Sequence, residues 1–69
     1  MNAHLVAGFR ADLEVAIGYL RISKSIKDMG DVRQTRGVYV CTINLTKPFK
    51  EVADQLSARF GKFIQLRKV

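Results

Sequence analysis

Enzymatic chemistry in this chain would have to start from His4 and Cys41, its one histidine and its one cysteine. Together they could act as a general base and a nucleophile. Their positions argue against this role, because chain ends fray and a cysteine inside an apolar run behaves as a small core residue. One Cys and one His also fall short of the four ligands of a structural zinc site. We therefore expect neither a catalytic pair nor a metal site.

The carboxylates and glycines supply no second constellation. The six Asp and Glu residues are scattered beside basic residues, as is usual for solvated surfaces. The five glycines match neither the G-x-G-x-x-G pattern nor the P-loop that cradles phosphate groups. The sequence therefore predicts a protein that is not an enzyme and binds no cofactor.

Positive charge is the strongest chemical feature of the chain. Twelve Lys and Arg residues face six Asp and Glu residues, for a net charge of +6. Most of the excess lies in residues 36–69, so the second half would attract nucleic acid or an acidic protein surface. Few aromatic residues are available to stack on bases, and no zinc finger or RNA-recognition signature is present.

A protein-binding surface is the alternative use of this charge. Tyr and Arg are enriched among the residues that dominate binding energy at interfaces. Arg33, Arg36 and Tyr39 lie close together in the sequence. We predict that these three residues contact a partner, supported by Lys47 and Lys50.

The stretch Thr35–Leu45 has two apolar faces if it forms a strand, because side chains alternate. If Val38 and Val40 face the core, Tyr39 points outward to a partner; otherwise Tyr39 packs inside with its hydroxyl at the rim. One face should pack on a helix. The other would meet the N-terminal segment, a second copy or a target.

The clearest element is a helix over residues 47–60. An apolar stripe at helical spacing predicts its core side, with Thr46 as N-cap, Pro48 in the first turn and Gly61 beyond the end. The stripe consists of Phe49, Val52, Ala53, Leu56 and Phe60. Strands are predicted on either side, at Val38–Leu45 and Lys62–Lys68. This order suggests a right-handed β-α-β unit, unless the last strand pairs elsewhere, for example with a second chain.

The first thirty residues allow two interpretations. An apolar stripe and the Ala, Leu and Glu content favour a helix around residues 3–20, continued to a C-cap at Gly30. Alternation at residues 13–19 and the RISKSI stretch favour a long β-ribbon that turns at Met29-Gly30-Asp31. Both give a small α+β domain in which the 47–60 helix packs on a sheet, and residues 1–69 form one domain.

Size and composition set further expectations. A domain of this length buries only about 60% of its unfolded surface. One cysteine cannot form an internal disulfide, so oligomerisation is the remaining route to extra stability, and we expect a homodimer. The lone thiol suits a reducing compartment. Without an apolar stretch long enough to span a membrane or a signal-peptide pattern, we expect a cytoplasmic location.

Over essentially its whole length the chain resembles the quorum-sensing anti-activators encoded by Pseudomonas phages. The resemblance is carried by MNAHLVAGFRADLEVAIGYL, TRGVYVCTINLTKPFKEVADQL and FIQLRKV. It implies a non-enzymatic inhibitor in the host cytoplasm that binds two host proteins, the quorum-sensing regulator LasR and the type IV pilus ATPase PilB. Host defence and twitching motility would be suppressed. No catalytic residue carries over. The alternative is a small basic DNA-binding repressor.

Overall fold

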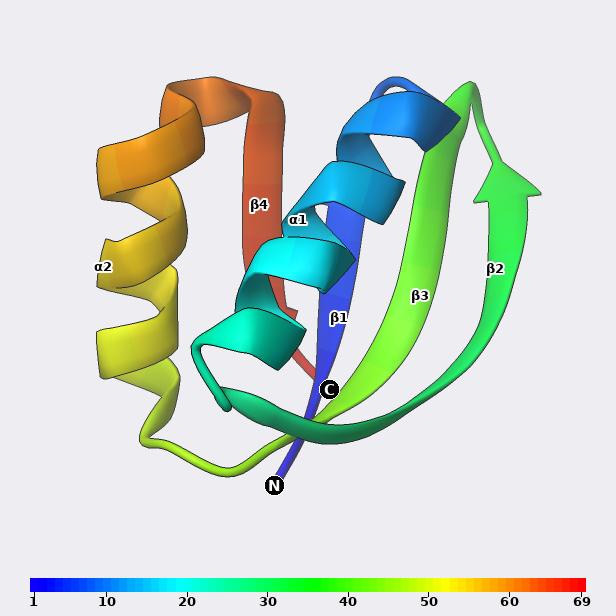
Figure 1. Cartoon of the computed structure of the whole chain (residues 1–69). Helices are drawn as coiled ribbons and strands as arrows, with labels where there is room; N and C mark the ends of the chain where they lie inside the picture. The colour runs from blue at the N-terminus through cyan, green and yellow to red at the C-terminus, as the bar shows by residue number, and fades with distance from the viewer.

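The chain forms two layers, a four-stranded antiparallel sheet and a pair of helices that cover one of its faces (Figure 1). The computed structural model describes residues 1–69. The elements are β1 (Asn2–Ala7), α1 (Arg10–Ile22), β2 (Ile26–Thr35), β3 (Val38–Leu45), α2 (Phe49–Phe60), the 3-10 turn η1 (Gly61–Phe63) and β4 (Ile64–Lys68). The predicted α+β class is confirmed.

The sheet has the strand order β2-β3-β1-β4. Because β1 is antiparallel to both β3 and β4, these two outer neighbours run in the same direction with β1 between them. The β3-α2-β4 crossover predicted from the sequence is therefore present in a split form. With β1-α1-β2 as the second split unit, the chain has the β-α-β-β-α-β order of ferredoxin-like folds. β4 pairs with β1 of the same chain, not with a second chain.

The second half of the chain agrees closely with the sequence pattern. The predicted strand at Val38–Leu45 is β3, whereas the strand predicted at Lys62–Lys68 begins only at Ile64, after η1. In the predicted stripe of α2, Val52 and Leu56 are buried, Phe49 and Phe60 pack against the core, and Ala53 is half-buried. Gly61 ends α2 with a positive φ of 62°. The N-cap prediction is wrong: Pro48 occupies the N-cap position, and the Thr46 hydroxyl instead donates to the Lys24 carbonyl oxygen at 2.6 Å.

Neither interpretation of the first thirty residues is right as a whole. Residues 2–7 form a strand because Ala3, Leu5 and Ala7 alternate toward the core, and only α1 carries the helical stripe. The helix ends at Ile22, well before Gly30. Residues 29–31 lie inside β2, where the register with β3 shifts between Met29 and Val32, and not in a turn. The chain reverses six residues later, at Arg36-Gly37.

This hairpin turn gives a stability prediction. Thr35 pairs with Val38, so the loop holds only Arg36 and Gly37, with φ values of +50° and +79°. Asn-Gly is favoured in such loops because Asn tolerates positive φ better than Arg does. Arg36→Asn should raise the free energy of unfolding by about 1 kcal/mol in urea denaturation. Arg36→Ala removes the same charge and keeps the strain, so an equal gain there would contradict this explanation.

The alternating side chains of β3 settle which of its faces meets the helices. Cys41, Ile43 and Leu45 are buried in the core. Val38 and Val40 lie on the opposite, open face of the sheet, where no element of the chain covers them. The premise that these two valines face the core is therefore wrong.

Neither helix is long and apolar enough to cross a membrane.

Candidate functional site

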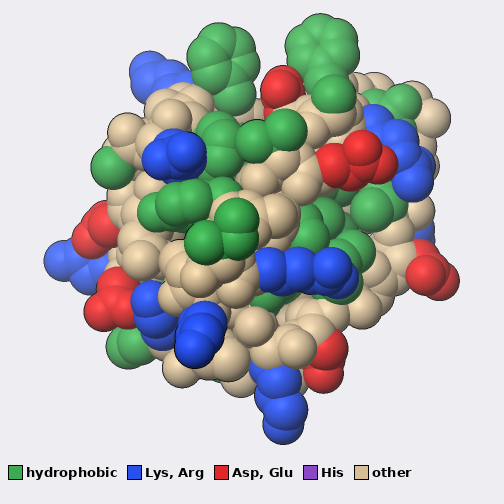
Figure 2. All heavy atoms as spheres, viewed as in Figure 1, with side chains coloured by type: hydrophobic (Ala, Val, Ile, Leu, Met, Phe, Trp, Pro, Cys, Tyr) green, Lys and Arg blue, Asp and Glu red, His purple; other side chains and the backbone are tan.

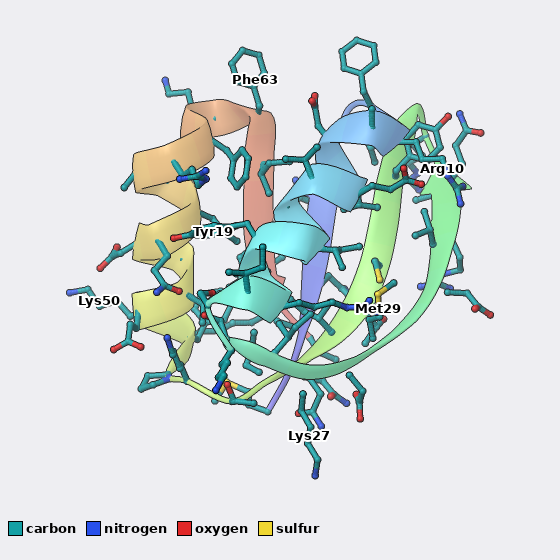
Figure 3. All side chains as sticks on the ribbon, in the orientation of Figure 1. Arg10, Tyr19, Lys27, Met29, Lys50 and Phe63 are labelled. Carbon is teal, nitrogen blue, oxygen red and sulfur yellow. The ribbon has the colours of Figure 1, made fainter.

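The structure does not bring the five predicted contact residues together. Arg33, Arg36 and Tyr39 lie at the hairpin end of the sheet, whereas Lys47 and Lys50 follow the other end of β3. The seven residue steps along β3 separate these ends by about 23 Å. Figure 3 shows Lys50 on the outer side of α2, far from the hairpin. One compact patch of all five is ruled out.

Tyr39 and Lys47 make contacts within the fold, whereas Arg33 lies on the open face of the sheet. Tyr39 lies on the helix-covered face and packs against the core, while Arg33 pairs with Val40 on the open face. The two side chains therefore leave opposite sides of the sheet. Lys47 is half-buried, and its Nζ donates to the Ser23 carbonyl oxygen at 3.0 Å. Lys47 thus ties two loops of the fold together.

His4 and Cys41 are also on opposite faces of the sheet. His4 lies on the open face opposite Thr42, while Cys41 is fully buried under the helices. The Cys41 thiol donates to the Gly30 carbonyl oxygen at 3.3 Å. Burial raises the pKa of this thiol, and the nearby Asp31 carboxylate adds to the rise. No group of three or more His, Cys, Asp or Glu side chains is placed to hold a metal ion.

The most distinctive surface lies between the two helices. Besides its buried stripe, α1 has a second apolar stripe at positions i, i+4 and i+7, formed by Val15, Tyr19 and Ile22. Val15 is 60% exposed and Ile22 is 85% exposed. Figure 2 shows hydrophobic side chains exposed across this helical face, with Lys and Arg side chains among them. An exposed stripe at helical spacing is unusual for a helix whose core side is already satisfied.

Two adjoining hollows follow this stripe. One, of about 490 Å³, is formed by α1 with Arg59 of α2; the other, of about 340 Å³, continues toward the start of β4. Arg59 lines both, so the hollows form one surface, here called the interhelical groove. Its lining residues are Asp12, Val15, Gly18, Tyr19, Ile22, Arg59, Phe60, Phe63 and Ile64.

Three side chains build the centre of the interhelical groove. Tyr19 extends from α1 toward α2 (Figure 3) and meets Phe60 edge-to-face, with ring centroids 5.9 Å apart. The Arg59 guanidinium lies over the Tyr19 ring, 4.8 Å from its centroid. The only salt bridge of the chain joins Arg10 and Glu14, so Arg59 has no carboxylate partner. At one end of the groove Phe63 projects outward and is 76% exposed.

Sequence reasoning missed this groove. A signal was present, since Val15 and Ile22 are seven residues apart and fit a helical stripe distinct from the core stripe. It could not be used while residues 13–19 also fitted a strand. The pairing of Tyr19 with Arg59 depends on the packing of two helices that are distant in the sequence.

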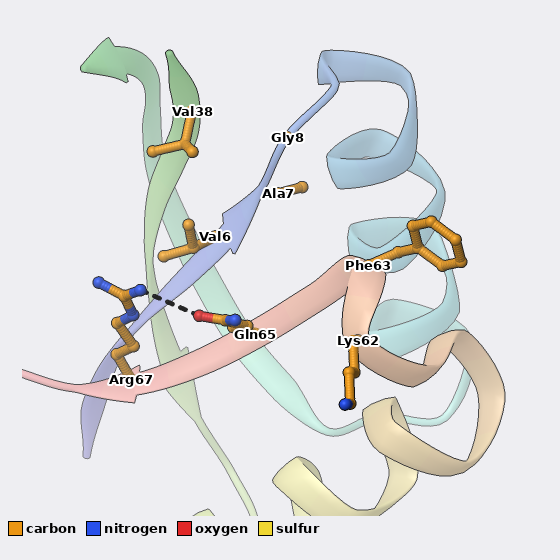
Figure 4. Close-up of a pocket in the computed structure, with 8 residues that line it drawn as sticks. All are labelled: Val6, Ala7, Gly8, Val38, Lys62, Phe63, Gln65 and Arg67. Atoms are coloured by element: carbon orange, nitrogen blue, oxygen red, sulfur yellow. Dashed lines mark hydrogen bonds between the residues drawn. The ribbon is translucent and has the colours of Figure 1, made fainter. Parts of the chain in front are cut away.

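The open face of the sheet is a second, more polar surface. Val6 and Val40 pair at its centre, with Gln65 and Arg33 beside them and Arg67 opposite His4. Two hollows of about 510 and 160 Å³ lie on this face, and neither is lined by a carboxylate. In the smaller one, drawn in Figure 4, Arg67 donates to Gln65 Oε1 at 3.0 Å.

No protein-family model, curated protein or solved structure matches the chain. Its function therefore has to be inferred from its own surfaces.

Proposed function

We propose that the protein is a non-enzymatic binding domain that acts by occupying a surface of another protein through its interhelical groove. One observation carries the proposal: the exposed apolar stripe of α1 lies beside the unpaired Arg59, held on the Tyr19 ring. Apolar side chains around an aromatic and an arginine are the composition of binding hot spots.

The exposed side chains of the groove contribute little to folding. Val15, Ile22 and Phe63 keep 60–85% of their surface in water, so most of their hydrophobic free energy is still available. A partner that covers these side chains would gain this hydrophobic free energy as binding affinity. Inhibition by occlusion needs only this affinity and suitable geometry, with no reacting group.

The resemblance to phage-encoded anti-activators supports a specific form of the proposal. In that form the partners are host proteins, LasR and PilB, and the protein acts in the host cytoplasm. Binding would keep the regulator from activating transcription and the ATPase from driving pilus assembly. The net charge of +6 favours acidic surfaces on either partner.

A charge placed in the groove tests the proposal with purified LasR and PilB. Ile22→Glu should weaken binding by at least about tenfold, because a carboxylate would be desolvated against apolar side chains. The fold should be retained, since Ile22 is 85% exposed. Ala58→Glu adds the same charge at an exposed position of α2 outside the groove and should bind as the wild type does. Binding unchanged by Ile22→Glu, or no binding to either protein, would reject this form of the proposal.

The open sheet face favours a second candidate function, nucleic-acid binding. Arg33 and Arg67 lie on it, and neither of its hollows is lined by a carboxylate. Two results would support this function: retention of the chain on duplex DNA that falls steeply as salt rises, and weaker retention of the double variant Arg33→Gln/Arg67→Gln than of the wild type. We propose that the expected homodimer forms through the same face. A mass of one chain in light scattering would exclude the homodimer.

A further inference from the structure

We propose that the interhelical groove receives an amphipathic helix of an acidic partner. A large apolar residue of that helix would enter the hollow over Gly18, and a neighbouring carboxylate would pair with Arg59. This inference rests on the proposed binding function and names the chemistry of what is bound.

Gly18 lies in the interior of α1 and lines the 490 Å³ hollow. Glycine is less favourable than alanine in a helix interior. The backbone does not require it, since only Gly37 and Gly61 among the glycines have positive φ. Packing does not require it either, because a Cβ at Gly18 would meet nothing within 4 Å. Because Gly18 has no side chain, the floor of the hollow is left open.

The side chains around that floor are spaced as on a helix face. Val15 and Ile22 stand about one turn before and after Gly18 on the same helix, and Tyr19 closes the side toward α2. A hole flanked in this way is complementary to a large side chain from a facing helix, as in knobs-into-holes packing. The facing helix would present anchors at i, i+3 or i+4, and i+7.

The hollow also carries an unpaired positive charge. Arg59 is the only charged residue that lines this hollow, and it has no carboxylate partner. The Arg59 guanidinium lies over the Tyr19 ring and donates no hydrogen bond within the chain, so its N–H donors are available to bind a carboxylate in bidentate fashion. Because each chain carries a net charge of +6, a second copy is a poorer occupant than an acidic segment.

The backbone of the occupant also has to be satisfied. The 490 Å³ hollow is lined only by residues of the two helices, whose backbone groups bond within each helix, so it offers no ladder to an extended peptide. A bound segment must therefore satisfy its own N–H and C=O groups, and a helix does so.

The test uses a displayed library of helical peptides, about five turns long, with one face randomised and selected on the full chain. We expect enrichment of Leu, Ile, Met or Phe at helical spacing, together with Asp or Glu. The selected peptides should bind Gly18→Leu at least about tenfold more weakly, because the new side chain fills the hollow. Arg59→Gln should remove the preference for an acidic over a matched lysine-bearing peptide.

Stability measurements keep these variants interpretable. Gly18→Ala should raise Tm by about 3–8 °C, and Gly18→Leu should not lower it, since the added atoms meet open space. Selected peptides that lack acidic residues, that bind Gly18→Leu as they bind the wild type, or that fail to emerge at all would overturn the inference. A dimer that Gly18→Leu converts to monomers would also overturn it, by showing a second copy in the groove. The proposed binding of LasR and PilB through the groove is tested separately, by the Ile22→Glu comparison.

Discussion

Leu5→Ala should lower the free energy of unfolding by about 2–5 kcal/mol. Leu5 is fully buried in the central strand β1, between Cys41 of β3 and Leu66 of β4. Its side chain lies in the core under the helices, so truncation leaves a cavity that a small sheet cannot close. At about 0.05–0.15 kcal/mol per residue, a chain of this length has only about 3–10 kcal/mol of stability. The variant should therefore lose a large part of the stability of the chain.

Denaturation in urea, followed by circular dichroism, measures this loss. Ile22→Ala is the matched control, because it removes a similar apolar volume from a position that is 85% exposed. Its effect should stay within about 0.5 kcal/mol. Equal losses at Leu5 and Ile22 would contradict the division of the apolar residues into a core and an exposed groove stripe.

The second half of the fold could be predicted from the sequence because its local signals agree. Val38–Leu45 is rich in β-branched residues, and the following stripe fits only a helix. Gly61 then ends that helix where the pattern places it. Two boundaries were misassigned. Lys62 and Phe63 belong to η1 and not to the last strand, and α2 begins later than predicted, with Thr46 bound to the Lys24 carbonyl oxygen. A local capping preference was overridden by a contact across the chain.

The first half was ambiguous because its apolar residues fit two periods at once. Leu5 and Val6 extend the helical stripe of α1, yet they belong to β1, whose pairing partners lie in β3 and β4. Those partners are distant in sequence, so no local window contains them. The same limit applies to the candidate site. Arg33 and Tyr39 are close along the chain but leave opposite faces, whereas Tyr19 and Arg59 are far apart and touch.

Ser25→Ala should lower the free energy of unfolding by about 1–3 kcal/mol, although it removes a single oxygen atom. Ser25 is the one fully buried polar residue. Its hydroxyl donates to Gln55 Oε1 at 3.0 Å and lies 2.8 Å from the Ser23 hydroxyl. Its carbonyl oxygen accepts from the Thr46 backbone N–H at 3.0 Å. Loss of the hydroxyl would leave the Gln55 oxygen without this donor.

A double-mutant cycle with Gln55→Ala isolates the side-chain pair from the effects of the single changes. Ser57→Ala, at an exposed position of α2, is the control and should change stability by less than about 0.5 kcal/mol. A coupling energy near zero would show that water replaces the lost hydroxyl.

The Ser25 hydrogen bonds also bear on the interhelical groove. They join the segment that follows α1 to the middle of α2, and these two helices form the groove walls. Ser25→Ala should therefore weaken peptide binding in the groove even under conditions where the chain remains folded. Binding that stays at the wild-type level would show that the sheet alone fixes the distance between the helices.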